Sequence, residues 1–109
     1  MPRGEFLGDF EQLILLAILR LGDDAYGLRV QSELAKRAGR TASIGAIYTT
    51  LERLEEKELV RSAVGESTPE RGGRAKRIFT VSGAGRAALS QSIGATRSMS
   101  AGLKGLDFV

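Results

Sequence analysis

The sequence contains no cysteine, histidine or tryptophan among its 109 residues, and only two prolines. Without cysteine there can be no disulfide, no redox-sensing thiol and no thiolate metal site. Without histidine as well, a zinc site would need carboxylates alone, and neither a Cys-His nor a Ser-His-Asp catalytic group can form. We therefore expect no metal, no cofactor and no catalytic residues.

Long hydrophobic runs are also lacking. No segment approaches the length of a membrane span, and no basic segment followed by an apolar one has the form of a secretory leader. We expect a cytoplasmic protein with no membrane partner, and the length fits a single domain. The net charge is only +3, but five basic residues lie against two glutamates between positions 61 and 77, and four glutamates against two basic residues between positions 52 and 58.

Three helices are expected in the first half of the chain. The first has Asp9 as its expected N-cap and ends at Gly22, and because it is apolar nearly all round it should be central in the fold. The second has Asp24 as its expected N-cap and ends at Gly39. The third begins after the N-cap Ser43. Its inward stripe of apolar residues, at helical spacing, consists of Ile44, Ile47, Tyr48, Leu51 and Leu54.

The pattern then changes to a period of two residues. Segments 59–65 and 74–81 are typical of two strands joined by a loop that contains Pro69, Gly72 and Gly73. A last helix follows from Ser82, its expected N-cap, although glycines weaken it. The predicted fold is therefore mainly α with a small β-hairpin, a winged helix-turn-helix with an additional C-terminal helix. We expect a DNA-binding unit over residues 1–82 and a dimerisation helix with a short tail over residues 83–109.

The outward face of the third helix carries mainly small residues. A helix that enters the DNA major groove needs such a slim face near its N-terminus, so that its backbone can approach the base edges. Tyr48 fits the core better, and contact of its hydroxyl with a phosphate comes second. Taken alone, this face is better interpreted as an ordinary solvated helix surface. The candidate DNA contacts of this helix are Ser43, Ala46, Tyr48, Thr49, Thr50 and Arg53.

The loop between the two strands, "TPERGGRAKRIF", is strongly basic. Basic solvated loops are common, but this one directly follows the third helix, where a hairpin can reach the DNA backbone and add salt-sensitive affinity. The order of helix, hairpin and basic tip favours binding to double-stranded DNA. The candidate contacts of the wing are Arg71, Gly72, Gly73, Arg74, Lys76 and Arg77.

The last helix would be marginal in isolation, because it is rich in glycine and serine. Packing against the same helix of a second chain would stabilise it. Two-fold symmetry would then place the third helices of the two chains about 34 Å apart, which is one turn of DNA. The alternative is that the tail folds back onto its own first helix; we favour the homodimer. The candidate dimerisation residues are Leu89, Ile93, Met99 and Leu103.

These segments together resemble the PadR family of bacterial transcriptional regulators over roughly residues 7–89. The most specific matches are the Tyr-x-x-Leu-x-x-Leu-Glu run from Tyr48 to Glu55, and the Gly-Arg pairs at Gly73 and Gly85. The sequence departs from the family where Thr49 replaces a frequent proline, and where Glu58 replaces a common glycine between helix and strand.

The resemblance implies a winged-helix dimer that binds palindromic operator DNA, usually as a repressor that a small-molecule effector releases. The effector would bind in the apolar space between the tail helices and the first helices of the dimer. A second hypothesis, from the residues alone, is a winged-helix module that binds protein partners. Neutralising Arg71 and Arg74 would separate the two, since it should weaken DNA binding and spare protein binding.

Overall fold

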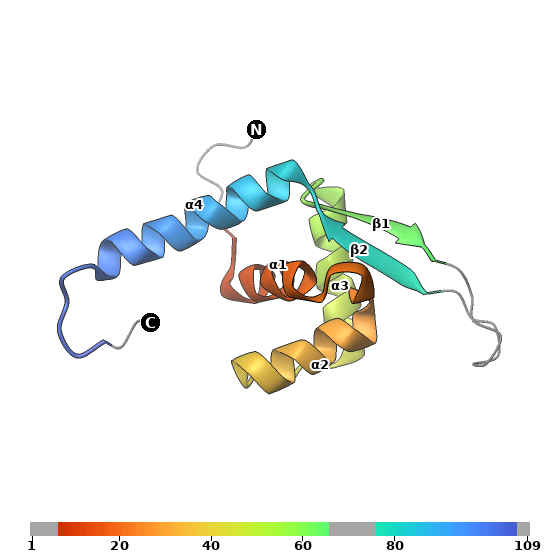
Figure 1. The fold of residues 1–109 in the computed structure, drawn as a ribbon, viewed down its shortest axis with the longest axis horizontal. Coiled ribbons are helices and arrows are strands. Elements are labelled where there is room, and N and C mark those ends of the chain that lie inside the picture. Colours follow the sequence, from red (N-terminus) through yellow and green to blue (C-terminus); the bar gives the residue numbers. More distant parts are fainter. Residues whose placement is uncertain (1–6, 66–75, 107–109) are drawn as a thin grey trace.

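The computed structural model describes residues 7–65 and 76–106 (Figure 1). The order of elements is the predicted one, three helices followed by an antiparallel hairpin and a last helix. The elements are α1 (Asp9–Leu21), η1, a 3-10 turn (Gly22–Asp24), α2 (Gly27–Ala38), α3 (Ile44–Glu56), β1 (Val60–Val64), β2 (Arg77–Val81) and α4 (Gly83–Ser100). This is the plan of a winged helix-turn-helix.

Several predicted helix ends are confirmed. The Ser43 hydroxyl accepts a hydrogen bond from the backbone N–H of Ala46 at 3.1 Å, and the Ser82 hydroxyl accepts one from Gly85 at 3.0 Å. Each serine thus satisfies one of the backbone donors that a helix start leaves unpaired. Gly39 ends α2 with a φ of 62°, the left-handed conformation for which glycine is the favoured residue.

Two predicted caps are wrong. Gly8 is the N-cap of α1, and its N–H donates to the Glu11 carboxylate at 3.1 Å, so Asp9 is already helical. The capping glutamate lies three residues after Gly8, which moves the helix start by one position. Asp24 closes the 3-10 turn instead of starting α2, because its carbonyl accepts from the N–H of Tyr26 at 2.9 Å, and Tyr26 is the N-cap.

Helix α1 lies at the centre of the molecule, as its apolar sequence predicts. It contacts α2, α3, α4 and β2, and Figure 1 shows it between α4 and α2. Its residues Ile14 and Leu15 have no exposed surface. The residues that the other elements contribute to the buried core are Val30, Leu34, Ile47, Leu51, Leu54, Val60, Phe79, Val81 and Leu89.

The hairpin is fixed to the helical body through β2. The two strands pair with Val60 opposite Val81 and Val64 opposite Arg77. Phe79 is completely buried, and its N–H donates to the Ala25 carbonyl at 2.8 Å. The direction in which the hairpin leaves the body is therefore set by both a core side chain and a backbone hydrogen bond.

The start of α4 approaches the body very closely. A Cβ atom on Gly85 would lie 2.1 Å from the Leu59 carbonyl oxygen, so only glycine fits there. One helical turn further Leu89 is buried, and Ser92 accepts a hydrogen bond from the Leu7 N–H at 3.2 Å. The first half of α4 is thus part of the chain's own fold.

Candidate nucleic-acid interface

Helix α3 has one face in the core and one in solvent. Ile47, Leu51 and Leu54 have no exposed surface, which anchors the helix along its length. Of the candidate DNA contacts, Ser43, Ala46, Thr49 and Arg53 are exposed, as is Gly45, and Arg53 lies in the last turn of α3. Apart from Arg53, these side chains are small, so another molecule can approach the backbone of α3 closely here.

One predicted contact of this face is wrong in position. Thr50 is only 6% exposed, whereas Ile44, assigned to the inward stripe, is 37% exposed. The buried face of α3 is therefore rotated away from Ile44 and towards Thr50, whose apolar methyl group can be buried in the core. Thr50 lies one turn from both Ile47 and Leu54, so it borders the buried stripe of α3.

Tyr48 is half-buried, in agreement with the core interpretation of its ring. A Cβ atom on Gly27 would lie 2.5 Å from the Tyr48 ring and hydroxyl, so the absence of a side chain on α2 makes room for it. The ring also lies 6.4 Å from that of Phe79, centroid to centroid. Tyr48 thus joins α2, α3 and β2.

The turn before α3 is held by polar contacts that the sequence interpretation missed. The Gln31 side-chain amide of α2 donates to the Ala42 carbonyl at 2.8 Å. Arg40 pairs with Asp9 at 3.2 Å, and its guanidinium lies 5.1 Å from the centre of the Phe10 ring. The only feature of the sequence that points to Arg40 is its position beside the turn. Its partners Asp9 and Phe10 are about thirty positions away in the chain and meet it only in the folded structure.

Charge is distributed unevenly along α3. Its N-terminus carries the positive end of the helix dipole and no acidic residue in the first turn. The exposed carboxylates Glu52, Glu56 and Glu58 lie at or beyond its C-terminal half. An anion such as a DNA phosphate is therefore favoured at the N-terminal end and disfavoured at the other.

The candidate wing residues divide into three groups. Lys76 is exposed, and its Nζ lies 4.4 Å from the centre of the Tyr26 ring. Arg77 is half-buried, and its guanidinium binds Glu55 and Ser62 within the chain. The remaining four, Arg71, Gly72, Gly73 and Arg74, lie outside the described residues.

The candidate dimerisation residues differ in how far they are buried. Leu89, at 5% exposure, belongs to the chain's own core, so the expectation that it packs against a second chain is wrong for this structure. Ile93 packs partly against that core. Met99 is 81% exposed, and Leu103 is 59% exposed and lies beyond the end of α4.

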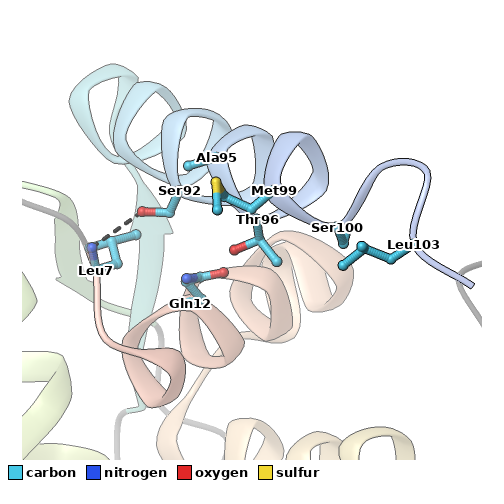
Figure 2. A pocket seen from close by; sticks show the side chains of 8 residues that line it. All are labelled: Leu7, Gln12, Ser92, Ala95, Thr96, Met99, Ser100 and Leu103. Atoms are coloured by element: carbon cyan, nitrogen blue, oxygen red, sulfur yellow. Dashed lines mark hydrogen bonds between the residues drawn. The ribbon is translucent and has the colours of Figure 1, made fainter. Parts of the chain in front are cut away.

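An open groove separates the second half of α4 from the start of α1 (Figure 2). Its volume is about 540 Å³. Apolar Leu7, Met99 and Leu103 face it together with the polar side chain of Gln12. The remaining lining residues are Ser92, Ala95, Thr96 and Ser100.

No described helix is long and apolar enough to cross a membrane. Three helices, a hairpin and a slim exposed face on the third helix define a protein of the winged helix-turn-helix class. Comparison of the sequence with family models identifies the group within that class. The model of the transcriptional regulator PadR-like family matches residues 15–91, and the chain belongs to that family. It is thus a transcriptional regulator of a DNA-binding, non-enzymatic family.

Solved structures agree on the fold. A PadR-like transcriptional regulator from Bacillus cereus has 23% identity and a TM-score of 0.68, over 90% of this chain and 93% of that one. A PadR family regulator from Clostridium difficile has 24% identity and a TM-score of 0.64, over 83% and 90%. A PadR-like transcription factor from Bacteroides fragilis has 24% identity and a TM-score of 0.67, over 83% and 82%. A search of curated proteins gave no significant match.

Proposed function

We propose that the chain is a dimeric repressor that binds a pseudo-palindromic operator through α3 and the hairpin. The observation that carries this proposal is the exposed face of α3, where Ala46 and Thr49 leave the backbone accessible. Arg53 lies further along the same face and is long enough to reach a base edge or a phosphate. Family membership supports DNA binding in general, and the small exposed side chains of this face support α3 as the element that enters the groove.

Each candidate contact has a distinct chemical role. The Ser43 hydroxyl uses a lone pair on the Ala46 N–H and keeps its own proton free to donate to a phosphate. The Thr49 side chain offers a hydroxyl and a methyl group, and the methyl suits that of thymine. Arg53 suits the two acceptors on the major-groove edge of guanine. Tyr48, whose ring is packed, has only its hydroxyl for a phosphate.

The wing supplies affinity that does not depend on sequence. Lys76, together with Arg71 and Arg74 from the connecting segment, would neutralise phosphates beside the major groove. Release of counterions makes such contacts weaken with salt. The glycines Gly72 and Gly73 would let the backbone approach the duplex closely. Thr50 is left out of the interface because it is buried.

The second half of α4 and the segment that follows it support the dimer. Met99, Leu103 and Leu106 expose large apolar side chains that water solvates poorly, and a second copy of the chain would cover them. An effector in the groove between α1 and α4 would alter the spacing of the two α3 helices and so release the operator. Titration of an apolar compound library that never changes operator affinity would contradict this part.

The test begins with selection of a duplex from a random pool by the wild-type protein. Binding is then measured by fluorescence anisotropy, against a scrambled duplex and at several salt concentrations. Arg53→Ala should raise Kd for the selected duplex about tenfold or more, the usual cost of losing an arginine contact to a base. Saturation at two chains per duplex is expected for the dimer.

The control is Arg86→Ala, which removes the same charge from an exposed position on α4, outside the candidate face of α3. It should change Kd by less than about twofold, because no contact to DNA is expected there. A wild-type protein that enriches no sequence, or equal losses in the two variants, would overturn the proposed function. In that case a protein partner becomes the better hypothesis.

A further inference from the structure

A closed network joins the hairpin to α3. The Arg77 guanidinium on β2 donates through Nη2 to one carboxylate oxygen of Glu55. Its Nε donates to the Ser62 hydroxyl on β1 at 3.0 Å, and that hydroxyl donates to the other Glu55 oxygen at 2.8 Å. Side chains from β1, β2 and α3 therefore meet in one network.

The position of Arg77 on the strand explains this arrangement. Arg77 lies two residues before Phe79, so the two side chains share one face of β2. That face is directed to the core, since Phe79 is completely buried, and the Arg77 guanidinium carbon lies 5.0 Å from the centre of the Phe79 ring. Ser62 is the residue of β1 opposite Phe79. The guanidinium is thus held between ring, hydroxyl and carboxylate.

We propose that Arg77 is a positioning residue, which fixes the orientation of the wing hairpin (β1 and β2) to α3 through Glu55 and Ser62, and that it is not a phosphate contact. The proposal rests on the proposed function, because the orientation matters only when α3 and the wing bind the same duplex. It replaces the simplest interpretation of the basic loop, in which every arginine near the tip meets the DNA backbone.

The energetics favour the internal role. Charge-assisted hydrogen bonds to a carboxylate are stronger than neutral ones. Here the Ser62 hydroxyl also bridges Arg77 and Glu55, and the hydrogen bonds of such a network strengthen one another. Turning Arg77 to a phosphate would break both of its bonds and leave the Glu55 charge without its partner, close to a polyanion. Arg77 and Glu55 are each about two-thirds buried, with side-chain exposures of 36% and 33%, so this loss is only partly screened by water.

The decisive variant is Glu55→Gln, because the two roles of Arg77 predict opposite signs. Removal of a negative charge from a protein that binds DNA should leave affinity unchanged or improve it. If Glu55 orients the wing through Arg77, affinity for the selected duplex should instead fall about tenfold, the size of coupling within one hydrogen-bonded network. The matched control is Glu56→Gln, which removes the same charge one residue along α3, from an exposed side chain that forms no ion pair with any described residue.

Variants at position 77 separate the position of the side chain from its charge. Arg77→Lys keeps a cation for a phosphate but cannot make both hydrogen bonds, so we expect it to bind nearly as weakly as Arg77→Ala. The double variant Glu55→Gln, Arg77→Ala should bind no more weakly than either single variant, to within about twofold, because each breaks the same network. Far-UV circular dichroism establishes that every variant is folded at the assay temperature.

If Glu55→Gln does not fold, Ser62→Ala removes the bridging hydroxyl without a change of charge and should raise Kd about threefold, a partial loss of the network. Wild-type-like binding by Arg77→Lys, or equal affinity of Glu55→Gln and Glu56→Gln, would overturn the inference and make Arg77 a direct phosphate contact or irrelevant. In those cases the proposed function survives, as long as the wild type selects a duplex and Arg53→Ala weakens its binding. A wild type that selects nothing overturns the proposed function itself.

Discussion

The two halves of α4 have similar compositions and opposite surroundings. Residues 83–92 and 93–100 are both rich in glycine, alanine and serine. The first half buries Gly85, Leu89 and Ser92, whereas the second leaves Met99 almost fully exposed. The projecting half helps to explain a radius of gyration of 15.4 Å, since a compact domain of this length would have about 13 Å. Burial along α4 is thus set by what lies beside it.

The largest predicted effect comes from a methyl group at Gly85. Alanine is preferred over glycine in a helix by about 1 kcal/mol, but the new Cβ would lie 2.1 Å from the Leu59 carbonyl oxygen, which is backbone and cannot turn away. We expect Gly85→Ala to lower the free energy of unfolding by about 3 kcal/mol, towards the upper end of the cost of overpacking. Urea denaturation followed by far-UV circular dichroism measures it.

Gly94→Ala is the matched control in the second half of α4. Apart from its chain neighbours and the backbone of its own helix, no described atom lies within 4 Å of a Cβ at Gly94, so helix propensity should dominate. We expect a gain of about 0.5–1 kcal/mol at the same protein concentration. Equal effects at the two glycines would remove the distinction between the halves. A loss at Gly94 alone would indicate that the partner chain approaches the helix there.

The second prediction compares two apolar side chains of α4. Leu89→Ala should lower the free energy of unfolding by about 2–3 kcal/mol, the lower part of the range for buried leucine, because it lies at the edge of the core. Met99→Ala should cost the isolated chain almost nothing and instead raise the dimer dissociation constant by about tenfold, the loss of one buried side chain at an interface. Denaturation and sedimentation equilibrium measure the two quantities separately.

Protein concentration distinguishes the two mechanisms. The loss of stability in Leu89→Ala should persist at every concentration, whereas that in Met99→Ala should shrink towards zero as the protein is diluted below its dimer dissociation constant, because only the dimer loses a contact. A monomeric wild type at all concentrations, or Met99→Ala with an unchanged association constant, would contradict the assignment of the second half of α4 to the dimer.

Much of the fold could be predicted because the signals are local. The switch from helical spacing to a period of two, and the caps Ser43, Ser82 and Gly39, each depend on a few consecutive residues. The caps of α1 and α2 were misplaced by short distances, because Gly8 and Tyr26 carry no side-chain cap and are recognised only through Glu11 and the 3-10 turn.

The site was harder to predict because its contacts join distant parts of the chain. Helical spacing placed the exposed face of α3 correctly at Ala46, Thr49 and Arg53, but the rotation that buries Thr50 depends on which neighbours α3 packs against. The pairing of Arg77 with Glu55 connects residues 22 positions apart. Its one available signal was the alternation that puts Arg77 on the same face as Phe79.

The smallest predicted effect concerns the turn between α3 and β1, which contacts the start of α4 through Ser82. Glu58 is the only non-glycine residue with a positive φ in the described ranges, at 64°, and its carbonyl accepts from the Ser82 hydroxyl at 2.7 Å. Glycine relieves a left-handed strain of about 1–2 kcal/mol but makes the unfolded chain more flexible. We therefore expect Glu58→Gly to stabilise the fold by about 0.5 kcal/mol. Glu52→Gly, in the middle of α3, should instead cost about 1 kcal/mol. Equal losses in the two variants would mean that the backbone at Glu58 is unstrained.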